Sequence, residues 1–303
     1  LVIFSQNTCA TEKQLIISED MQFEYAQKLF NKKDYETAIV EFKRFTHFFP
    51  DSKFKSRADF NIGVCLFNLK KYHEAARAFN EIIINGKEDN ITKEAFFFQS
   101  KSFLNLGNTG YAQIVLQNFL KLAQASKQQD QETIDRIYIN LARIHFNEVK
   151  NGKEASLSIA KNYLSKLSEI GKEKYNFDHY YDLIQKVENT PKKNPIAAGF
   201  FAIIPGGGFL YCERYHDAFM TFLLNAGLIV AAYEAFENDN KALAGVIAFV
   251  ETGFYSGNIY GSISSAHKFN RAQTLKILNQ EFSITSVVDP EKNGYGLALN
   301  FKF

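Results

Sequence analysis

The first half of this 303-residue chain repeats one pattern of residue types at intervals of 37 residues. The first column of the pattern is Phe23, Phe60 and Phe97. Further columns keep the same phase: Leu29, Leu66 and Phe103; Phe30, Phe67 and Leu104; Asn31, Asn68 and Asn105; Ala38, Ala75 and Ala112; Phe42, Phe79 and Leu116; and Phe45, Ile82 and Phe119. Such a register predicts one structural unit copied in tandem, and so an array rather than a conventional catalytic domain.

Each unit reads as two antiparallel helices. Phe23, Ala26 and Phe30 follow the spacing of three or four residues that marks a buried helical face, and the spacing resumes after the polar stretch 31–34. That stretch is short, so the second helix must fold back on the first. The alanine column lies where two helix axes would approach closely, with aromatic side chains filling the remaining space.

The units resemble the tetratricopeptide repeat. The first copy carries Tyr35-x-x-Ala38-Ile39-x-x-Phe42, and the second carries Tyr72-x-x-Ala75-Ala76-x-x-Phe79. A third copy keeps Gly107 and Ala112, and a weaker fourth copy turns at 150–153. The resemblance covers residues 19–170 and is closest to envelope proteins with this repeat. It implies a helical-hairpin solenoid, which a helix over 175–189 would cap to complete a repeat domain of residues 19–190.

First helices of stacked repeats line one groove, which we expect to bind a protein partner as an extended or helical peptide. The candidate contacts recur along those helices: Phe23, Phe60 and Phe97, and the amide column Asn31, Asn68, Asn105 and Asn147. An Asn side chain can bond a peptide backbone at both its C=O and its NH₂. The alternative is structural. Each Asn would cap the C-terminal end of its helix, where Asn tolerates the left-handed conformation, and each Phe would be core between repeats.

Charge almost disappears after Pro195. Ala218–Phe236 carries one acidic or basic residue, Glu234, and Ala242–Ser265 carries only Glu251. Each segment is long enough to cross a hydrocarbon layer of about 30 Å, and Ile196–Ile204 is a shorter apolar run. We therefore expect a membrane helical domain over residues 191–280, embedded in a lipid bilayer. The alternative is a buried helical hairpin in a soluble domain.

Small residues recur every four positions along one face of the last span, at Gly253, Gly257, Gly261 and Ser265. In lipid they would let helix backbones touch, within the chain or between two copies in a homo-oligomer. Glycine costs about 1 kcal/mol in a soluble helix, so three in register need such a reason. Glu234 and Glu251 are costly in lipid. We expect them near the span ends or bonded within the bundle, although an intramembrane glutamate can also mark a proton or substrate path.

A glycine-rich break, Pro205-Gly206-Gly207-Gly208, follows the first apolar run and leads to Tyr211. It resembles the Pro-Gly-x-Gly-x-x-Tyr signature of an uncharacterised family of small bacterial membrane-hairpin domains. The match covers residues 195–270, with Phe209-Leu210 where the commonest form of the signature has a glutamine. The resemblance implies a membrane-embedded module. The break would also admit a re-entrant loop whose backbone is covered by protein or water.

Residues 1–10 look like the remnant of a signal peptide, because Leu1–Phe4 is apolar and Thr8-Cys9-Ala10 offers small residues for a leader peptidase. We therefore expect export to the bacterial cell envelope, with the membrane domain in the inner membrane and the repeats in the periplasm. An ordinary cytosolic start is the alternative. Three crossings would place Arg214 and the basic cluster 267–276 in the cytoplasm, in agreement with the positive-inside rule. A re-entrant first segment would reverse the other two spans.

The last residues, 281–303, carry a β-prone pattern. Phe282–Val288 and Tyr295–Phe303 are joined by a loop that contains Pro290 and Asn293-Gly294, which predicts a hairpin. The alternation in the second segment resembles the last strand of an outer-membrane β-barrel, but one hairpin cannot close a barrel. It would add to a partner's sheet edge or pack on the chain's own helices. The predicted fold is therefore all-α, a repeat solenoid followed by a transmembrane helical bundle and this short hairpin.

Composition limits the function further. A net charge of +2 gives no footprint for nucleic acid. Three widely spaced Cys and six scattered His predict no disulfide framework and no metal site, and no cofactor motif appears. We predict a non-enzymatic, membrane-anchored scaffold that binds a protein partner in envelope assembly, secretion or polymer export. The alternative is a membrane transporter, channel or enzyme that uses Glu234, Glu251 and the Gly206–Gly208 break, with the repeats as a regulatory arm.

Overall fold

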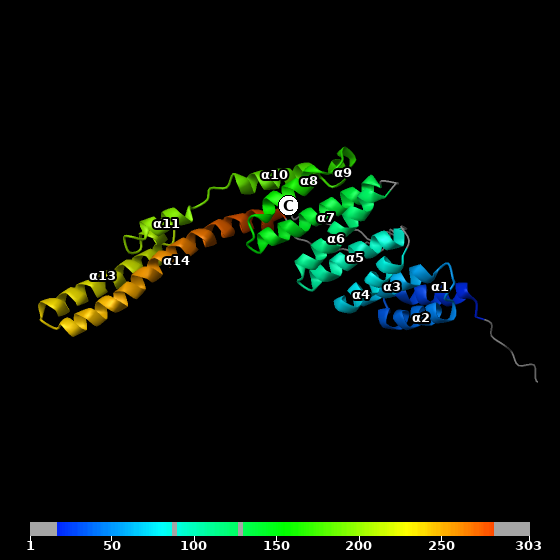
Figure 1. Ribbon diagram of the computed structural model, residues 1–303, viewed down its shortest axis with the longest axis horizontal. Coiled ribbons are helices and arrows are strands. Elements are labelled where there is room, and N and C mark those ends of the chain that lie inside the picture. The colour runs from blue at the N-terminus through cyan, green and yellow to red at the C-terminus, as the bar shows by residue number, and fades with distance from the viewer. Residues whose placement is uncertain (1–16, 87–89, 127–129, 282–303) are drawn as a thin grey trace, which may run out of the picture. The chain divides into compact units, whose positions relative to one another are not determined.

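The computed structural model describes residues 17–86, 90–126 and 130–281, and all regular secondary structure in these ranges is α-helical (Figure 1). The chain divides into two compact units. The first unit runs to Ile144 and includes residues 166–168, and the second holds residues 145–165 and everything from Glu169 onward. The predicted C-terminal hairpin and the signal-peptide remnant lie outside the described residues.

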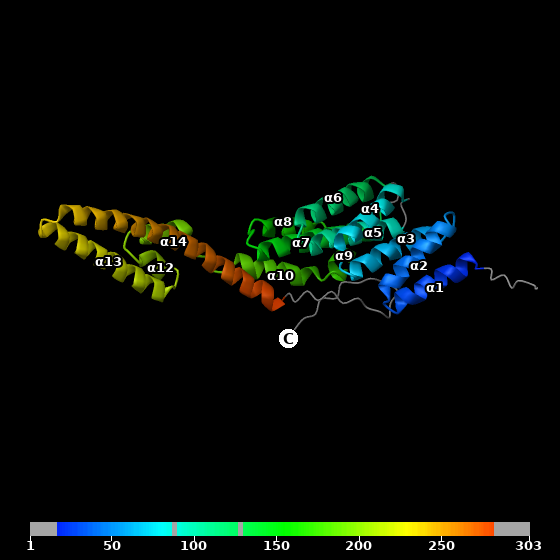
Figure 2. The same ribbon diagram turned by 90° about the horizontal axis from the view of Figure 1, so that it is seen from below.

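The first unit is a series of antiparallel helix pairs in which each helix from α1 to α5 packs against the next (Figure 2). Its helices are α1 (Glu19–Asn31), α2 (Tyr35–Phe48), α3 (Lys55–Asn68), α4 (Tyr72–Asn85), α5 (Asn90–Asn105), α6 (Thr109–Ala125) and the first part of α7 (Gln131–Lys150). First helices of neighbouring pairs also touch, α1 with α3 and α3 with α5. The predicted order of two helices per 37-residue unit is therefore confirmed for the three copies that end in α2, α4 and α6.

The turns between paired helices repeat the same backbone geometry. Lys33, Lys70 and Gly107 take the left-handed conformation, with φ of 63°, 60° and 74°, and they are spaced 37 residues apart. Each second helix then begins at the next residue but one, and the side chains of Asp34 and Asn108 cap α2 and α6 by accepting from the backbone N–H three residues on. Left-handed backbone thus falls two residues after Asn31, Asn68 and Asn105, and not on the Asn itself.

The repeat core is built from the predicted columns. Ala38, Ala75 and Ala112 have no exposed surface, and Phe42 and Phe79 are likewise fully buried. Ring contacts continue from pair to pair: the ring centroids of Phe60 and Phe79 are 5.6 Å apart, and those of Phe79 and Phe98 are 5.3 Å apart. Small residues at the closest approach and aromatic rings around them are the packing that the sequence pattern predicts.

The second unit contains the end of α7, five short helices and a long helical hairpin (Figure 1). Its helices after α7 are α8 (Ser156–Ser165), α9 (Glu169–Lys174), α10 (Phe177–Glu188), α11 (Pro195–Phe201), α12 (Gly207–Tyr211), α13 (Tyr215–Glu237) and α14 (Lys241–Glu281). The helix predicted over 175–189 forms as α10 and buries Tyr180, Leu183, Ile184 and Val187 against α8, α9 and α14. Figures 1 and 2 both show α13 and α14 side by side, joined by the turn at 238–240.

Among the described helices, α13 is the one that is long and apolar enough to cross a membrane by length and composition. The second predicted span, Ala242–Ser265, lies inside the 41-residue helix α14. The first apolar run forms only the seven-residue helix α11, followed by a turn and the five-residue helix α12. At about 1.5 Å per residue, α11 is about 10 Å long and cannot cross a hydrocarbon layer of about 30 Å. The expectation of three crossings is therefore wrong.

Candidate functional site

The amide column lies at the ends of the first helices. Asn31, Asn68 and Asn105 are the last residues of α1, α3 and α5. The side-chain N–H of Asn68 donates to Val64 O at 2.9 Å, and that of Asn105 donates to Lys101 O at 2.8 Å. The Oδ1 of Asn31 accepts from Gln27 at 3.1 Å. Asn147 lies before the end of α7, where its carbonyl accepts from Asn151 N. The amides at 68 and 105 therefore close the last turn of their helices by an i to i−4 bond.

The phenylalanine column is core. Phe60 and Phe97 are buried, and Phe23 is partly buried with its ring stacked on that of Phe54 at 4.7 Å between centroids. Phe97 contacts Phe119 on one side, and the guanidinium carbon of Arg136 lies 3.9 Å from its ring centroid. These three aromatic rings pack in the repeat core, as the structural alternative for this column expects, and their contact with a partner stays a prediction.

Polar bridges between first helices were not predicted from the sequence. The side-chain N–H of Asn61 on α3 donates to Gln27 Oε1 on α1 at 2.9 Å. Arg136 on α7 donates through both guanidinium ends to the carboxylate of Glu94 on α5. These residues do not belong to the apolar columns that define the 37-residue repeat, so the repeat pattern did not predict their contacts. They show that the first helices present a polar, hydrogen-bonded face.

A second ion pair links α5 to the start of α7. Lys93 Nζ donates to Asp130 Oδ2 at 2.7 Å, and Asp130 also accepts from the backbone N–H and the hydroxyl of Thr133. Hydrogen bonds from Lys93 and Thr133 favour the charged form and lower the pKa of Asp130 to about 2. The next cation on this face, Lys101, lies over the rings of Phe67 and Phe98, where burial lowers its pKa.

In the second unit, the segment that contains α11 and α12 leaves one end of the helical hairpin and returns to it. The hydroxyl of Tyr211 accepts from Asn194 N at 3.0 Å, so the two ends of the segment lie together. Asn270 on α14 fixes the start of the segment. Its Oδ1 accepts from Lys193 N at 2.8 Å, and its Nδ2 donates to Lys193 O at 2.9 Å. The segment is thus a re-entrant loop in form, packed on α14.

The turn of this loop is fixed deep along α14. Asn258 donates to Ala202 O at 2.8 Å and accepts from Gly206 N at 3.3 Å, and Tyr255 donates to Ile203 O at 2.8 Å. Asn258 is 3% exposed. The polar side chains of Asn258 and Tyr255 therefore satisfy the open backbone of the turn.

The glycine-rich break allows close packing of the backbone. Gly206 has a φ of +83°, and a Cβ built on it would lie 2.2 Å from Ala218 O. A Cβ on Gly207 would lie 2.4 Å from Phe201 O, and one on Gly208 would lie 2.3 Å from Ala198 O. Pro205, partly buried, precedes these close approaches. The signature residues Pro205 to Tyr211 thus build the loop itself.

The predicted small-residue face of α14 divides into two parts. A Cβ on Gly261 would lie 2.8 Å from the ring of Phe209, and Ser265 is buried and accepts from Arg214 Nη1 at 2.8 Å. Gly253 and Gly257 instead have nothing within 4 Å of an added Cβ. Gly261 and Ser265 therefore pack within the chain, whereas Gly253 and Gly257 border open space.

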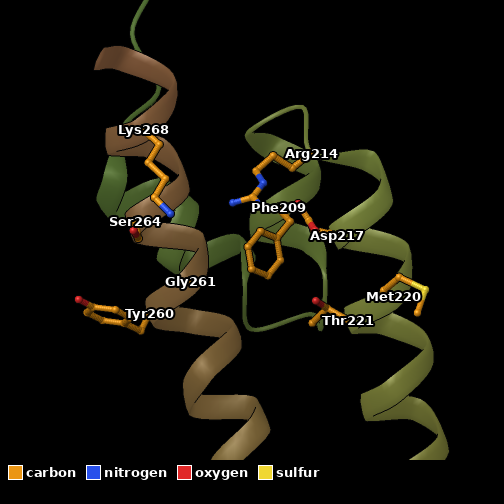
Figure 3. A pocket seen from close by; sticks show the side chains of 9 residues that line it. All are labelled: Phe209, Arg214, Asp217, Met220, Thr221, Tyr260, Gly261, Ser264 and Lys268. Carbon is orange, nitrogen blue, oxygen red and sulfur yellow. Dashed lines mark ion pairs between the residues drawn. The ribbon is translucent and has the colours of Figure 1, made fainter. Parts of the chain in front are cut away.

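That open space belongs to a cleft between α13 and α14. One hollow of about 390 Å³ is lined by Leu224, Asn225, Val250, Gly253, Phe254 and Gly257, together with Phe209, Thr221 and Asn258. A second hollow of about 380 Å³ shares Phe209 and Thr221 with the first and contains Arg214, Asp217, Ser264 and Lys268 (Figure 3). The cleft is thus apolar at one end and charged at the other.

The two glutamates of the predicted spans differ in their surroundings. Glu234 is exposed and lies one turn before the end of α13, as expected for a residue near a span end. Glu251 lies near the middle of the hairpin, and both of its carboxylate oxygens are buried without a hydrogen-bond partner among the described residues. Asn225, 1% exposed, donates to Thr221 O at 2.7 Å, while its Oδ1 is also unpaired in that part of the chain.

Side chains that could bind a metal are not gathered within the residues that the structure describes. No group of three His, Cys, Asp or Glu side chains there is placed to hold a metal ion. Cys65 and Cys212 are buried free thiols. Burial raises the pKa of Cys65 to about 12, which keeps it in the unreactive thiol form.

Comparison with known proteins agrees with the repeat geometry. The tetratricopeptide repeat family matches residues 57–85, which are α3, α4 and their turn. No curated protein matches this chain. Among solved structures, a TPR repeats protein from Bacteroides fragilis NCTC 9343 is similar over 88% of this chain and 98% of that chain, with 13% identity and a TM-score of 0.32. Residues 57–85 therefore form a tetratricopeptide repeat, a unit that implies a protein-interaction scaffold.

Proposed function

We propose that this chain is a non-enzymatic scaffold whose repeats bind a protein partner and whose hairpin of α13 and α14 anchors it in a bacterial membrane. The observation that carries the proposal is the tandem series of helix pairs, the second of which matches the tetratricopeptide repeat. Arrays of this kind bind partners along the face formed by their first helices. Envelope assembly, secretion or polymer export are the processes that such an anchored scaffold would serve.

The amide column provides the proposed contacts on that face. Because the side-chain N–H of Asn68 and that of Asn105 are used within their own helices, each side chain is held in one orientation. Within the described residues, neither Oδ1 accepts a hydrogen bond. Two fixed acceptors 37 residues apart in a repeated setting suit the backbone N–H groups of one extended peptide.

A photoreactive amino acid introduced in the full chain tests this surface in the native host. With the probe at Asn68 or Asn105, we expect one discrete protein adduct of the same mass. With the probe at exposed Asn85, the last residue of α4, we expect none. Retention of that partner by the purified full chain should fall about tenfold in the Asn68→Ala, Asn105→Ala double variant, because two hydrogen bonds are lost.

Asn85→Ala is the matched control and should retain the partner fully. Equal adducts from all three probe positions would contradict the assignment of this face, since an adventitious neighbour reacts without regard to position. Full retention by the double variant would show that the amides make no contact with the partner.

The anchor is argued from exposed apolar surface. Only 6% of the most apolar 18-residue stretch of α13 is buried, whereas a core helix of a soluble protein is mostly buried. Phe219 and Tyr233 on α13 and Phe249 on α14 are 63%, 64% and 81% exposed. Apolar patches of this extent are rare on soluble proteins. At about 1.5 Å per residue α13 is about 34 Å long, which fits a hydrocarbon layer of about 30 Å.

Because α11 and α12 form a re-entrant segment, we propose two crossings instead of three: α13, and with it the apolar stretch 242–265 of α14, which packs along α13. Lys192, Lys193, Arg214 and the basic residues of 268–276 then belong to one end of the hairpin, while the other end has Lys241 among Glu237 and Asp239. Positive residues favour the cytoplasmic side. We therefore propose an inner-membrane hairpin whose basic end faces the cytoplasm. The repeats then lie in the cytoplasm, whereas three crossings would place them in the periplasm.

Reporter fusions test this topology. Fusions at Asn189 and at the C-terminal Phe303 should both give the cytoplasmic signal, and a fusion at Asn238 should give the external one. Signals on opposite sides at Asn189 and Phe303 would contradict two crossings. External signals at both, with an internal signal at Asn238, would preserve two crossings and restore the periplasmic orientation. Extraction of the full chain from membranes by alkaline carbonate would contradict the anchor altogether.

A transporter or channel is the second candidate, and Glu251 is the observation that favours it. An unpaired carboxyl group inside an apolar hairpin is costly and often functional. The Gly206–Gly208 break does not support this candidate, because its glycines are used in close packing. Flux through vesicles reconstituted with the full chain, lost in Glu251→Gln, would favour transport over the scaffold.

A further inference from the structure

We propose that the cleft between α13 and α14 binds one anionic phospholipid, with the phosphate at Arg214 and Lys268 and an acyl chain along Gly257 and Gly253. The inference rests on the proposed membrane anchor. It names the lipid class that the anchor selects, which bilayer insertion alone does not require.

The charged end of the cleft favours a phosphate. Figure 3 shows Arg214 and Lys268 reaching toward each other from opposite walls, above the ring of Phe209. Arg214 is held in place by Asp217 and by a 2.8 Å hydrogen bond to Ser265 Oγ. Lys268 is exposed and has no ion-pair partner within the described residues. Two cations and one carboxylate leave a net positive hollow of about 380 Å³, and an anion is the complementary ligand.

The position of these cations matches that of a lipid headgroup. Arg214 immediately precedes α13, and Lys268 follows the apolar stretch of α14 by one turn. Both therefore lie where the apolar length of the hairpin ends, which is the level of phosphates in a bilayer. Lysine and arginine near the surface of an anionic membrane each contribute about fivefold to binding.

The other end of the cleft favours an acyl chain. Gly253 and Gly257 leave its floor open, and Leu224, Val250 and Phe254 form apolar walls. From Lys268 to Gly253 is 15 residues of α14, about 22 Å at about 1.5 Å per residue. That length accommodates a headgroup and one chain of a single leaflet, which is about half of a 30 Å hydrocarbon layer.

Charge argues against a second copy of this chain as the occupant. Two copies inserted in the same direction would meet about a two-fold axis along the membrane normal, so residues at the same depth would face each other. Arg214 and Lys268 of one copy would then meet those of the other. An anionic lipid relieves this accumulation of positive charge, whereas a second copy doubles it.

The full chain in neutral detergent, titrated with phosphatidylglycerol and with phosphatidylcholine and examined by native mass spectrometry, tests the proposal. We expect a first phosphatidylglycerol to bind at least tenfold more tightly than phosphatidylcholine. Lys268→Gln should reduce that preference about fivefold, and Lys268→Arg should preserve it. Gly257→Leu should weaken both lipids by filling the floor of the cleft. The Lys241→Gln, Lys276→Gln double variant removes two cations outside the cleft and should change nothing.

Several outcomes would overturn the inference. If Lys268→Gln and the double control had the same preference for phosphatidylglycerol over phosphatidylcholine, lipid binding would depend on the net charge of the chain and not on the cleft. Binding unaffected by Gly257→Leu, or competition by glycerol phosphate alone at the concentration that is effective for the lipid, would remove the acyl-chain part. A stable dimer that Gly257→Leu dissociates would assign the cleft to a second copy. If the chain inserts into neutral vesicles but shows no lipid preference, the anchor stands and this inference fails.

Discussion

Replacing Phe79 with alanine is expected to lower the free energy of unfolding of the repeat unit by about 3–5 kcal/mol. Phe79 has no exposed surface and lies between the rings of Phe60 and Phe98. A Cβ on Gly63 would lie 2.6 Å from this ring, so α3 and α4 approach closely at Phe79. Removing it leaves a cavity that rigid aromatic neighbours cannot close.

Hydrogen exchange of the full chain measures this effect locally. A loss of 3 kcal/mol or more should speed exchange of the core amides of α3, α4 and α5 by a factor of at least about 100. Phe48→Ala is the control, because Phe48 is a phenylalanine near the end of α2 with 66% of its surface exposed. It should change stability by less than about 0.5 kcal/mol. Similar exchange in the two variants would contradict the assignment of Phe79 to the core.

The repeat fold could be predicted because its signal is local and copied. Ala38, Ala75 and Ala112 recur in phase, and all three are fully buried. With three copies, the residue types that the fold requires can be told from those that recur by chance. The turn geometry was harder to predict from the sequence. Its left-handed position is occupied by Lys33 and Lys70 in two copies and by glycine, Gly107, only in the third. Lysine carries no sequence signal for that conformation.

Contacts between first helices could not be predicted from the same pattern. Glu94 and Arg136 meet across a separation of 42 residues, which differs from the repeat length. Asn61 and Gln27 meet across 34. Such pairs depend on which faces the stacked helices present to one another, and that is set by packing of the whole array. The candidate face for a partner is therefore a property of the assembled repeats.

The segments predicted to span a membrane show that the length of an apolar run does not by itself give the path of the chain. Ile196–Ile204 is apolar, but its path is decided by hydrogen bonds between distant residues, such as Asn258 to Ala202 and Tyr211 to Asn194. The sequence did contain one relevant sign, the glycine-rich break that admits a re-entrant loop. It could not show that the break closes against α14, because the partner residues lie about 50 positions away in the chain.

Gly208→Ala is expected to destabilise the second unit by about 3 kcal/mol or more, at the upper end of what overpacking costs. The added methyl group would lie 2.3 Å from Ala198 O and 2.4 Å from Ser262 Cβ. The first of these atoms is backbone, so it cannot move aside by a change of rotamer. Accommodating the methyl group requires α11 to separate from α12, which would also strain the hydrogen bond between Tyr211 and Asn194 N.

Gly253→Ala is the same substitution in the same unit with the opposite expectation. Nothing lies within 4 Å of its Cβ, so the variant should gain up to about 1 kcal/mol of helix propensity. Thermal unfolding of both variants of the full chain in one detergent compares them directly. A lower transition temperature for Gly208→Ala alone is the expected result. Equal transition temperatures would contradict the close packing of α12, and with it the claim that the glycine break exists to build a re-entrant loop.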